Sequence, residues 1–305
     1  MNDLGLLRIL VAVHECGSTT GAAERLNVSQ PSISQGLGRL RDITGDQMFI
    51  RGSRSMTPTS LATQLYLECR SPLNQLEGTF RADEPFDPKT TRDRFTIAFS
   101  DIGALTFLPP LVGALQKRAP GIRIEATPLE ITQVDSLLKS GRLDFAIGKL
   151  ETQDPALSQI DLIDQHYAAI VRRDHPTIQG ALDEETFRNA AHAVVSDAAG
   201  HWQAVSHVVH ADEPAFDVRL TLAQFNVLPA TIRESNLIGV VPHRSAVAFS
   251  ETWNLQVLDI PIPLPRFTVR LLAHKGTGQR RTAYDWMTTF IKDVLGSGPT
   301  DPGQV

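Results

Sequence analysis

The 305-residue sequence has few cysteines and no long apolar run, and both features exclude classes of protein. Its two cysteines, Cys16 and Cys69, lie far apart, which argues against a disulfide framework and a Cys-x-x-Cys zinc site. No stretch of about eighteen apolar residues occurs, so we expect no membrane-spanning helix. The apolar run Leu4–Val13 is interrupted by Arg8 and lacks the basic start and cleavage site of a secretory signal. We therefore expect a cytoplasmic protein without membrane partners.

The chain also lacks an excess of positive charge and the motifs of common enzymes. It carries 29 Lys and Arg against 34 Asp and Glu, so any nucleic-acid contact must be confined to a local patch. It has no G-x-G-x-x-G, P-loop, H-E-x-x-H or G-x-S-x-G motif, and its nine histidines do not cluster at metal or triad spacing. We expect neither catalysis nor a cofactor or metal.

A linker divides the chain near residue 90. Residues 82–94, ADEPFDPKTTRDR, combine two prolines with dense charge and show no apolar period. Three short helices are predicted at the N-terminus, with Ser18 as the cap of the second, and strands alternate with helices after the linker. This alternation predicts two α/β units with mostly parallel sheets. The tail, residues 296–305, is rich in Gly and Pro and is expected to be disordered.

The third predicted helix, which Ser29 caps, is the most informative segment. Pro31 fits its first turn, where no backbone N–H is needed. Ile33, Leu37 and Leu40 recur at i, i+4 and i+7 and form one apolar face. The opposite face carries small or uncharged side chains, namely Gln30, Pro31, Ser34, Gln35 and Gly38. Such a face can enter a major groove closely, although an isolated polar face is more often plain surface.

Local charge favours the DNA interpretation. Residues 25–54 contain five arginines against two acidic residues, within a chain that is acidic overall. Arg39 and Arg41 flank the helix, and Arg51 and Arg54 lie in IRGSRSMTPT. This segment predicts a short strand and turn that form a basic wing against phosphates.

The segment AAERLNVSQPSISQGLGRLRDITGDQMFIR, followed by MTPT, resembles the winged helix-turn-helix of LysR-type transcriptional regulators. The resemblance implies that residues 29–35 open the recognition helix and that Arg51 and Arg54 form the wing. The DNA-contacting residues it implies are Ser29, Gln30, Pro31, Ser32, Ser34, Gln35, Arg39, Arg51 and Arg54. The sequence departs from the family at Gln35, where arginine is frequent, and Gly36 and Gly38 each weaken the helix by about 1 kcal/mol.

An apolar stripe follows the wing between Thr59 and Phe80. Its members, spaced as on a helix, are Leu61, Leu65, Leu73, Leu76 and Phe80. The stripe suits pairing with a second copy, as in the family's linker helix, and predicts a homodimer or homotetramer. Covering its own domain is the alternative. Pro72 predicts a kink or break near Arg70.

The remainder resembles the family's effector domain, which is similar to periplasmic solute-binding proteins. The segment FDPKTTRDRFTIAFSDIGALTFLPPL resembles the branch that responds to aromatic compounds. The resemblance implies a ligand in the cleft between the two α/β units, near strand ends and helix N-termini. Candidate effector-binding residues at such ends are Ser100, Asp101, His166, Ser196, His201 and Phe225. Asp101 can instead cap its helix, His166 can be a plain strand end, and Phe225 can be core.

We therefore predict an α/β protein with an N-terminal winged helix-turn-helix, a long linker helix and a two-subdomain effector domain like that of periplasmic binding proteins. The predicted bounds are 1–58 for DNA binding, 59–91 for the linker helix and hinge, 92–295 for effector binding and 296–305 for the tail. Within the effector domain, subdomain I covers 92–162 and 267–295, and subdomain II covers 163–266. The implied function is sequence-specific transcriptional regulation in response to a small aromatic or carboxylated effector, with RNA polymerase as a further partner.

Two other functions fit parts of the sequence. A solute-binding protein has the same sheet pattern, but it needs a signal peptide and has no helical DNA-binding segment. A thiol redox-sensing regulator needs two cysteines in its sensing module, whereas Cys16 and Cys69 lie in the first helix and the linker helix.

Overall fold

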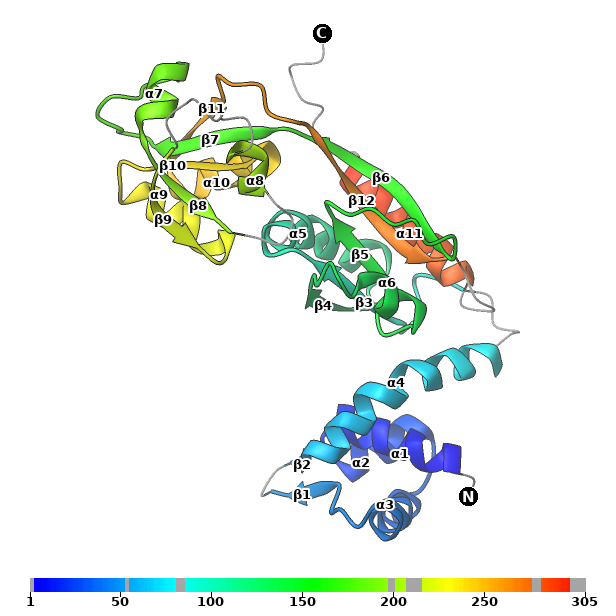
Figure 1. The fold of residues 1–305 in the computed structure, drawn as a ribbon. Helices are drawn as coiled ribbons and strands as arrows, with labels where there is room; N and C mark the ends of the chain where they lie inside the picture. The colour runs from blue at the N-terminus through cyan, green and yellow to red at the C-terminus, as the bar shows by residue number, and fades with distance from the viewer. Residues whose placement is uncertain are drawn as a thin grey trace. The chain divides into compact units, whose positions relative to one another are not determined.

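The computed structural model describes residues 3–52, 55–80, 86–196, 201–206, 216–275 and 281–296 (Figure 1). The chain divides into two compact units, formed mainly by Met1–Glu84 and by the residues after them. Within these described ranges, no helix is both long and apolar enough to span a membrane.

The N-terminal unit consists of helices and one hairpin. Its elements are α1 (Asp3–Cys16), α2 (Thr19–Leu26), α3 (Gln30–Thr44), β1 (Phe49–Arg51), β2 (Met56–Pro58) and α4 (Ser60–Phe80), with β1 and β2 antiparallel. Ser18 and Ser29 cap α2 and α3, because their side chains accept hydrogen bonds from the backbone N–H groups of Gly21 and Ser32. Both caps were predicted from the sequence and are confirmed.

Helices α1 and α3 meet closely in the core of this unit. Ile33, Leu37 and Leu40 are buried, as their spacing predicts. Gly36 is buried as well, and a Cβ at this position would lie 2.3 Å from Cδ1 of Ile9 on α1. The glycine that weakens α3 in isolation therefore allows the two helices to approach each other.

The linker helix α4 bears on two predictions. It continues from Ser60 to Phe80 with Pro72 inside it, so the helix does not break near Arg70. Pro72 is exposed, so the carbonyl that loses its partner can bond to water. The predicted pairing stripe partly covers its own unit, because its members pack on the local core at Leu61, Leu65 and Leu73. Leu67 lies on another side of α4 and is 58% exposed.

The larger unit contains two five-stranded sheets. The first sheet has the order β4-β3-β5-β12-β6. The subdomain built on it consists of β3 (Arg94–Phe99), α5 (Asp101–Arg118), β4 (Arg123–Pro128), α6 (Val134–Lys139), β5 (Phe145–Gly148), β6 (Leu157–Gln165), β12 (Phe267–His274) and α11 (Arg281–Gly296). Helices α5 and α11 pack on one face and α6 packs on the other. Strand β3 is parallel to β4 and β5, whereas β12 is antiparallel to β5 and β6.

The second sheet has the order β11-β7-β10-β8-β9. Its elements are β7 (Tyr167–Arg172), α7 (Glu184–Asn189), β8 (Ala191–Val195), α8 (His201–Ser206), β9 (Asp217–Leu222), η1 (Phe225–Val227), α9 (Leu228–Arg233), β10 (Ile238–Pro242), α10 (His243–Trp253) and β11 (Leu255–Asp259). Strand β7 is antiparallel to β10 and β11, while β8 is parallel to β9 and β10. In each sheet four strands run in one direction, as the prediction of mostly parallel sheets requires, and one strand, β12 in the first sheet and β7 in the second, runs against them.

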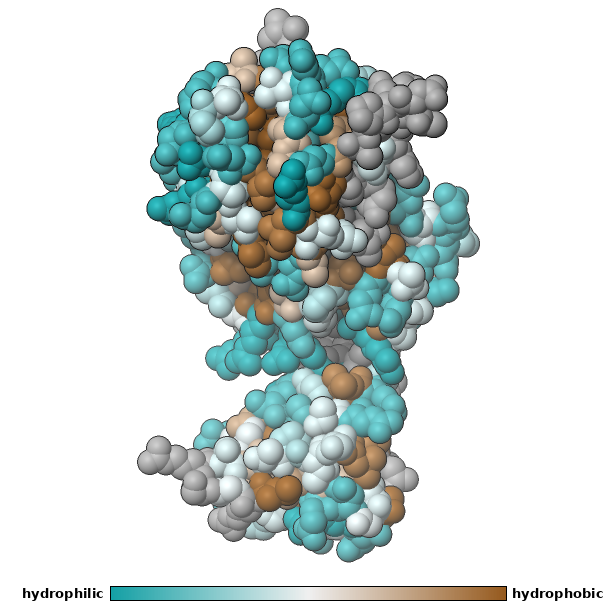
Figure 2. Space-filling model, turned by 60° about the vertical axis from the view of Figure 1, so that its left-hand side comes forward, coloured by the Kyte–Doolittle hydropathy of each residue, from teal (hydrophilic) through white to brown (hydrophobic). Residues whose placement is uncertain are grey.

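Apolar side chains fill the space between these layers and reach the surface. Figure 2 shows apolar residues gathered on one face of the larger unit between hydrophilic borders.

Elements β6, α7 and α10 were not indicated by the sequence patterns, whereas the return of β12 and α11 to the first subdomain was.

Candidate DNA-reading surface and effector pocket

The polar face of α3 is open to solvent. The exposed members of the predicted contact set are Ser29, Gln30, Pro31, Ser34, Gln35 and Arg39, and Ser32 is half-buried. Ser34 and Gln35 make no side-chain hydrogen bond to any described residue, so their hydroxyl and amide groups are available to other molecules. These groups can donate to and accept from base edges.

Some polar groups at the start of α3 serve its attachment to α2. Gln30 Nε2 donates to Thr19 Oγ1 at 3.1 Å, and the hydroxyls of Ser29 and Ser32 lie 2.8 Å apart. The bond from Gln30 fixes the N-terminal end of α3 against the preceding helix, whereas the contact between Ser29 and Ser32 lies within the start of α3. The end of a helix that enters a groove must be held in this way for its side chains to keep register.

The hairpin that follows α3 in the sequence is a second exposed element of this unit. Ile50 on β1 is 60% exposed, and Arg39 and Arg41 are exposed on α3. The side chain of Arg51 and the whole of Arg54 lie outside the described residues, so the basic wing stays a prediction.

Asp46 has a structural role that sequence reasoning missed. Its Oδ1 accepts hydrogen bonds from the backbone N–H of Met48 at 2.5 Å and from Thr59 Oγ1 at 2.7 Å. The carboxylate thereby ties the entry of the hairpin to the start of α4. The signal in the sequence was an acidic residue in an otherwise basic segment.

A pocket lies between the two subdomains of the larger unit. Its polar lining consists of Ser100, Thr106, Lys149, Gln165, His201 and Ser245, and its aromatic lining of Phe107 and Phe267. Among the described lining residues, Lys149 is the one cationic side chain, and no carboxylate faces the pocket. The enclosed volume is about 20 Å³, which is room for one or two water molecules.

The first turn of α5 touches both the pocket and the second subdomain. Ser100 lines the pocket, and its Oγ accepts from the backbone N–H of Gly103 at 3.1 Å. Asp101 does not line the pocket, because its carboxylate accepts from the backbone N–H of Phe225 at 2.5 Å. Ile102 packs into the core of the second subdomain. Asp101 thus joins the subdomains instead of capping its own helix.

His201 forms an aromatic wall of the pocket at the second subdomain, and Phe225 packs behind it. His201 lines the pocket and is 5% exposed, with its ring centre 5.6 Å from that of Phe225 and 5.4 Å from that of Phe267. Phe225 is 1% exposed and lies behind this wall in the core. Of this predicted pair, His201 is the one placed to meet a ligand.

His166 and Ser196 lie away from the pocket lining. His166 stacks on His243 with ring centres 4.5 Å apart. The backbone N–H of exposed Ser196 donates to Leu222 O at the end of β8. The structure therefore brings Ser100 and His201 together, with Phe225 behind them, and leaves His166 and Ser196 outside.

Lys149 and Gln165 are pocket residues that sequence reasoning missed. Lys149 follows the buried strand β5, whose C-terminal end is a usual place for ligands, and its Nζ lies 5.6 Å from the ring centre of Phe267. Gln165 is 3% exposed, and its Oε1 accepts from the backbone N–H of Arg244 at 3.5 Å. Its Nε2 makes no hydrogen bond within the described part of the chain, which leaves an amide donor at the pocket.

Further polar contacts close the cleft around this pocket. Thr106 on α5 and Ser245 on α10 share a hydrogen bond of 2.8 Å. Arg244 Nη1 donates to Leu295 O near the end of α11 at 2.9 Å. With the bond from Phe225 to Asp101, these contacts hold the two subdomains together across the cleft.

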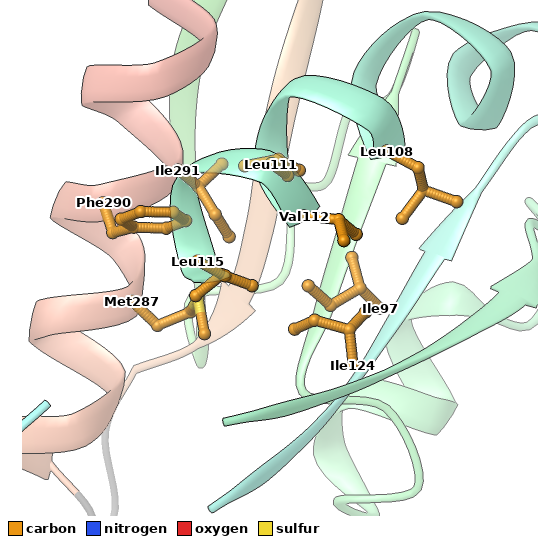
Figure 3. Close-up of a pocket in the computed structure, with 9 residues that line it drawn as sticks. All are labelled: Ile97, Leu108, Leu111, Val112, Leu115, Ile124, Met287, Phe290 and Ile291. Atoms are coloured by element: carbon orange, nitrogen blue, oxygen red, sulfur yellow. The ribbon is translucent and has the colours of Figure 1, made fainter. Parts of the chain in front are cut away.

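A second space, shown in Figure 3, has a different character. It lies between α5, α11 and strands β3 and β4, and its described lining is wholly apolar. Its enclosed volume is about 10 Å³. Because no polar group can orient a ligand there, we interpret it as a packing gap in the core of the first subdomain.

Comparison with known proteins agrees with this architecture. Residues 88–295 match the LysR substrate binding domain, and residues 4–63 match the bacterial regulatory helix-turn-helix of the lysR family. The chain is 29% identical over 294 residues to the HTH-type transcriptional activator NahR of Pseudomonas putida, covering 96% of this chain and 97% of the relative. It is 30% identical over 273 residues to the HTH-type transcriptional activator NagR of Ralstonia sp, covering 89% and 90%.

Solved structures share this fold. The probable transcriptional regulator PA0477 from Pseudomonas aeruginosa has a TM-score of 0.76 and 28% identity, covering 96% of this chain and 97% of that chain. Full-length CbnR complexed with its target DNA has the same fold, with a TM-score of 0.55 and 15% identity over 96% of this chain and 100% of that chain. The chain therefore belongs to the LysR family of transcriptional regulators, with an N-terminal helix-turn-helix and a C-terminal substrate-binding domain.

Proposed function

We propose that this regulator reads double-stranded DNA with α3 and senses a small aromatic carboxylate in the pocket between its subdomains. DNA reading is supported by the exposed polar face of α3, above all by Ser34 and Gln35, whose side chains make no bond to a described residue. The chain acts as a cytoplasmic homodimer or homotetramer, recruits RNA polymerase and catalyses no reaction. The relatives named above are transcriptional activators.

The proposed effector follows from the chemistry of the pocket. Lys149 supplies a positive charge, Gln165 an amide donor and Ser100 a hydroxyl, with no carboxylate in the described lining to repel an anion. Phe107 and Phe267 supply flat apolar surface. The combination of one cation, neutral donors and aromatic rings suits a planar ligand with a carboxylate, and this observation carries the proposal.

The proposed mechanism is a shift between two arrangements of the subdomains. An aromatic ring does not fit the closed volume of about 20 Å³, so the cleft must open for it. Opening strains or breaks the contacts of Asp101, Thr106 and Arg244 across the cleft. A ligand that binds the open form shifts the population toward it, and in a dimer this changes the bend of the bound DNA.

The DNA half of the proposal is tested by random-site selection with the intact chain. We expect a defined half-site motif, and the double variant Ser34→Ala with Gln35→Ala should lose it while keeping nonspecific binding. Selection of no motif by the wild-type chain would refute the DNA-reading role of α3.

The effector half is tested by thermal shift with substituted benzoates and their neutral amides. A ligand that prefers the folded state raises the melting temperature. We expect the acids to do so and the amides not, and Lys149→Met should remove the effect. Equal shifts from acid and amide in both proteins would refute an anionic effector.

A redox role has less support. Burial and the nearby Glu68 carboxylate both raise the pKa of the Cys69 thiol, which disfavours the reactive thiolate. Cys16 and Cys69 also lie in the N-terminal unit, on α1 and α4, outside the substrate-binding domain.

A further inference from the structure

Three helices of the N-terminal unit meet at one carboxylate, that of Glu15 near the end of α1. The side chain of Glu15 is 8% exposed. Arg25 on α2 donates to its Oε2, and Tyr66 on α4 donates to its Oε1 at 3.0 Å. Arg70, one turn further along α4, lies 3.6 Å from the same Oε1.

Aromatic and apolar contacts surround this carboxylate. His14 stacks on Tyr66 with ring centres 3.9 Å apart and planes 6° from parallel. The guanidinium carbon of Arg70 lies 5.6 Å from the centre of the Tyr66 ring. Val11 and Leu73 pack with Tyr66 beneath the polar groups. The middle turns of α4 are thus held against α1 by contacts of several kinds.

This arrangement is costly if its purpose is stability alone. A carboxylate that leaves water loses solvation, and pairing with two arginines and a hydroxyl offsets that loss only when the geometry is kept. Charged bonds of this kind have directional requirements that apolar packing lacks. The network therefore favours one orientation of α4 relative to the helix-turn-helix over neighbouring orientations.

We propose that Glu15 is a positioning residue that sets the spacing of the two DNA half-sites that the regulator accepts. The proposal rests on the proposed function, in which α4 pairs with a second copy. The helix has 21 residues and is about 32 Å long. The network contacts α4 at Tyr66 and Arg70, so about 21 Å of the helix lies beyond Tyr66. A rotation of about 10° about Tyr66 moves the far end of the helix by about 3.7 Å, which is comparable to the spacing of adjacent base pairs, about 3.4 Å. Weakening the Glu15 network should therefore make the regulator less selective for one spacing of the DNA half-sites.

The test is random-site selection with full-length wild-type, Glu15→Gln and Glu24→Gln proteins in parallel. Glu24 is an exposed glutamate on α2 and gives the same change of charge outside the network. We expect all three proteins to select the same half-site motif. Glu15→Gln should lower the preference for the best spacing over spacings one base pair longer or shorter by at least about fivefold, whereas Glu24→Gln should match the wild type.

The possible outcomes separate this proposal from the one on which it rests. An unchanged spacing preference in Glu15→Gln overturns the positioning role. If Glu15→Gln does not fold by circular dichroism, Tyr66→Phe decides, because it removes one hydrogen bond to Glu15 and keeps the stack on His14. A wild-type spacing preference in Tyr66→Phe then overturns the role. If the wild-type chain selects no motif, the DNA-reading function itself fails.

Discussion

At the residue scale, two glycines of α3 have opposite surroundings although the sequence treats them alike. A Cβ on Gly38 would meet no atom within 4 Å, whereas one on Gly36 would displace the end of Ile9. Ile9 is 4% exposed, so its terminal methyl has little room to move. At position 36, packing against Ile9 explains why a poor helix former is present. At position 38, glycine keeps the proposed DNA face free of a bulky side chain.

This difference predicts the effect of two identical substitutions. Gly38→Ala should raise the free energy of unfolding by about 0.5 to 1 kcal/mol, because alanine is the better helix former and nothing is displaced. Gly36→Ala should show no gain or a loss of about 1 kcal/mol, because strain at Ile9 cancels the propensity. Urea unfolding of both variants measures the contrast. Equal gains would show that α1 and α3 tolerate the methyl group.

His192 provides a prediction about pH. It is fully buried between Phe187 and Phe216, and burial lowers the pKa of His192 to about 4. In the unfolded chain histidine titrates near 6.5, so between about pH 6.5 and 4 the unfolded state binds more protons than the folded state. Stability must then fall as the pH drops through this window, by about 2.5 kcal/mol at pH 4.5.

The matched variant is His192→Phe, which keeps a ring between the same neighbours and cannot titrate. Urea unfolding from pH 7 to pH 4.5 should show a smaller decline for the variant than for the wild type. Parallel declines would mean that His192 becomes protonated in the folded state at its ordinary pKa.

At the scale of elements, the first turn of α5 combines the pocket with the contact between subdomains. Ser100 lines the pocket, Asp101 accepts from the backbone of Phe225, and Ile102 packs into the other subdomain. A helix of one subdomain is thereby fastened to the core of the other. Opening or closing of the cleft must therefore change the contacts of this turn.

The substitution Asp101→Ala tests this connection. If the bond from Phe225 favours the closed cleft, its loss should tighten binding of an aromatic carboxylate by about fivefold, because less free energy is needed to open the cleft. Asp183→Ala is the control, because Asp183 caps α7 through Thr186 and makes none of the described contacts across the cleft. Calorimetric titration measures both. Weaker binding by Asp101→Ala would instead place the carboxylate among the ligand contacts.

Elements with local signals were predictable and those without were not. The caps of Ser18 and Ser29 and the spacing of Ile33 and Leu37 lie within a few residues of each other, so the sequence indicates α2 and α3 directly. Gln165 reaches the pocket because β6 pairs with β12, more than a hundred residues away. Such pairing has no local pattern, and β6 and its terminal Gln165 were missed together.

In the whole molecule, one chain joins a DNA-binding unit to a substrate-binding unit. The family resemblance made this division predictable, because its motifs span both units. The resemblance did not indicate Lys149, or that the linker stripe begins by covering its own unit at Leu61 and Leu65. Both depend on three-dimensional packing that motif spacing does not encode.

In the proposed function, occupancy of the pocket changes the bend of the bound DNA. The most direct measurement is fluorescence energy transfer between the ends of a selected operator duplex, with wild-type and Lys149→Met proteins, as a substituted benzoate is added. We predict a saturable change in DNA bend with the wild type and none with the variant, which should still bind the operator. An acid that binds the wild-type pocket and leaves the DNA bend and affinity unchanged would refute this coupling between pocket and DNA.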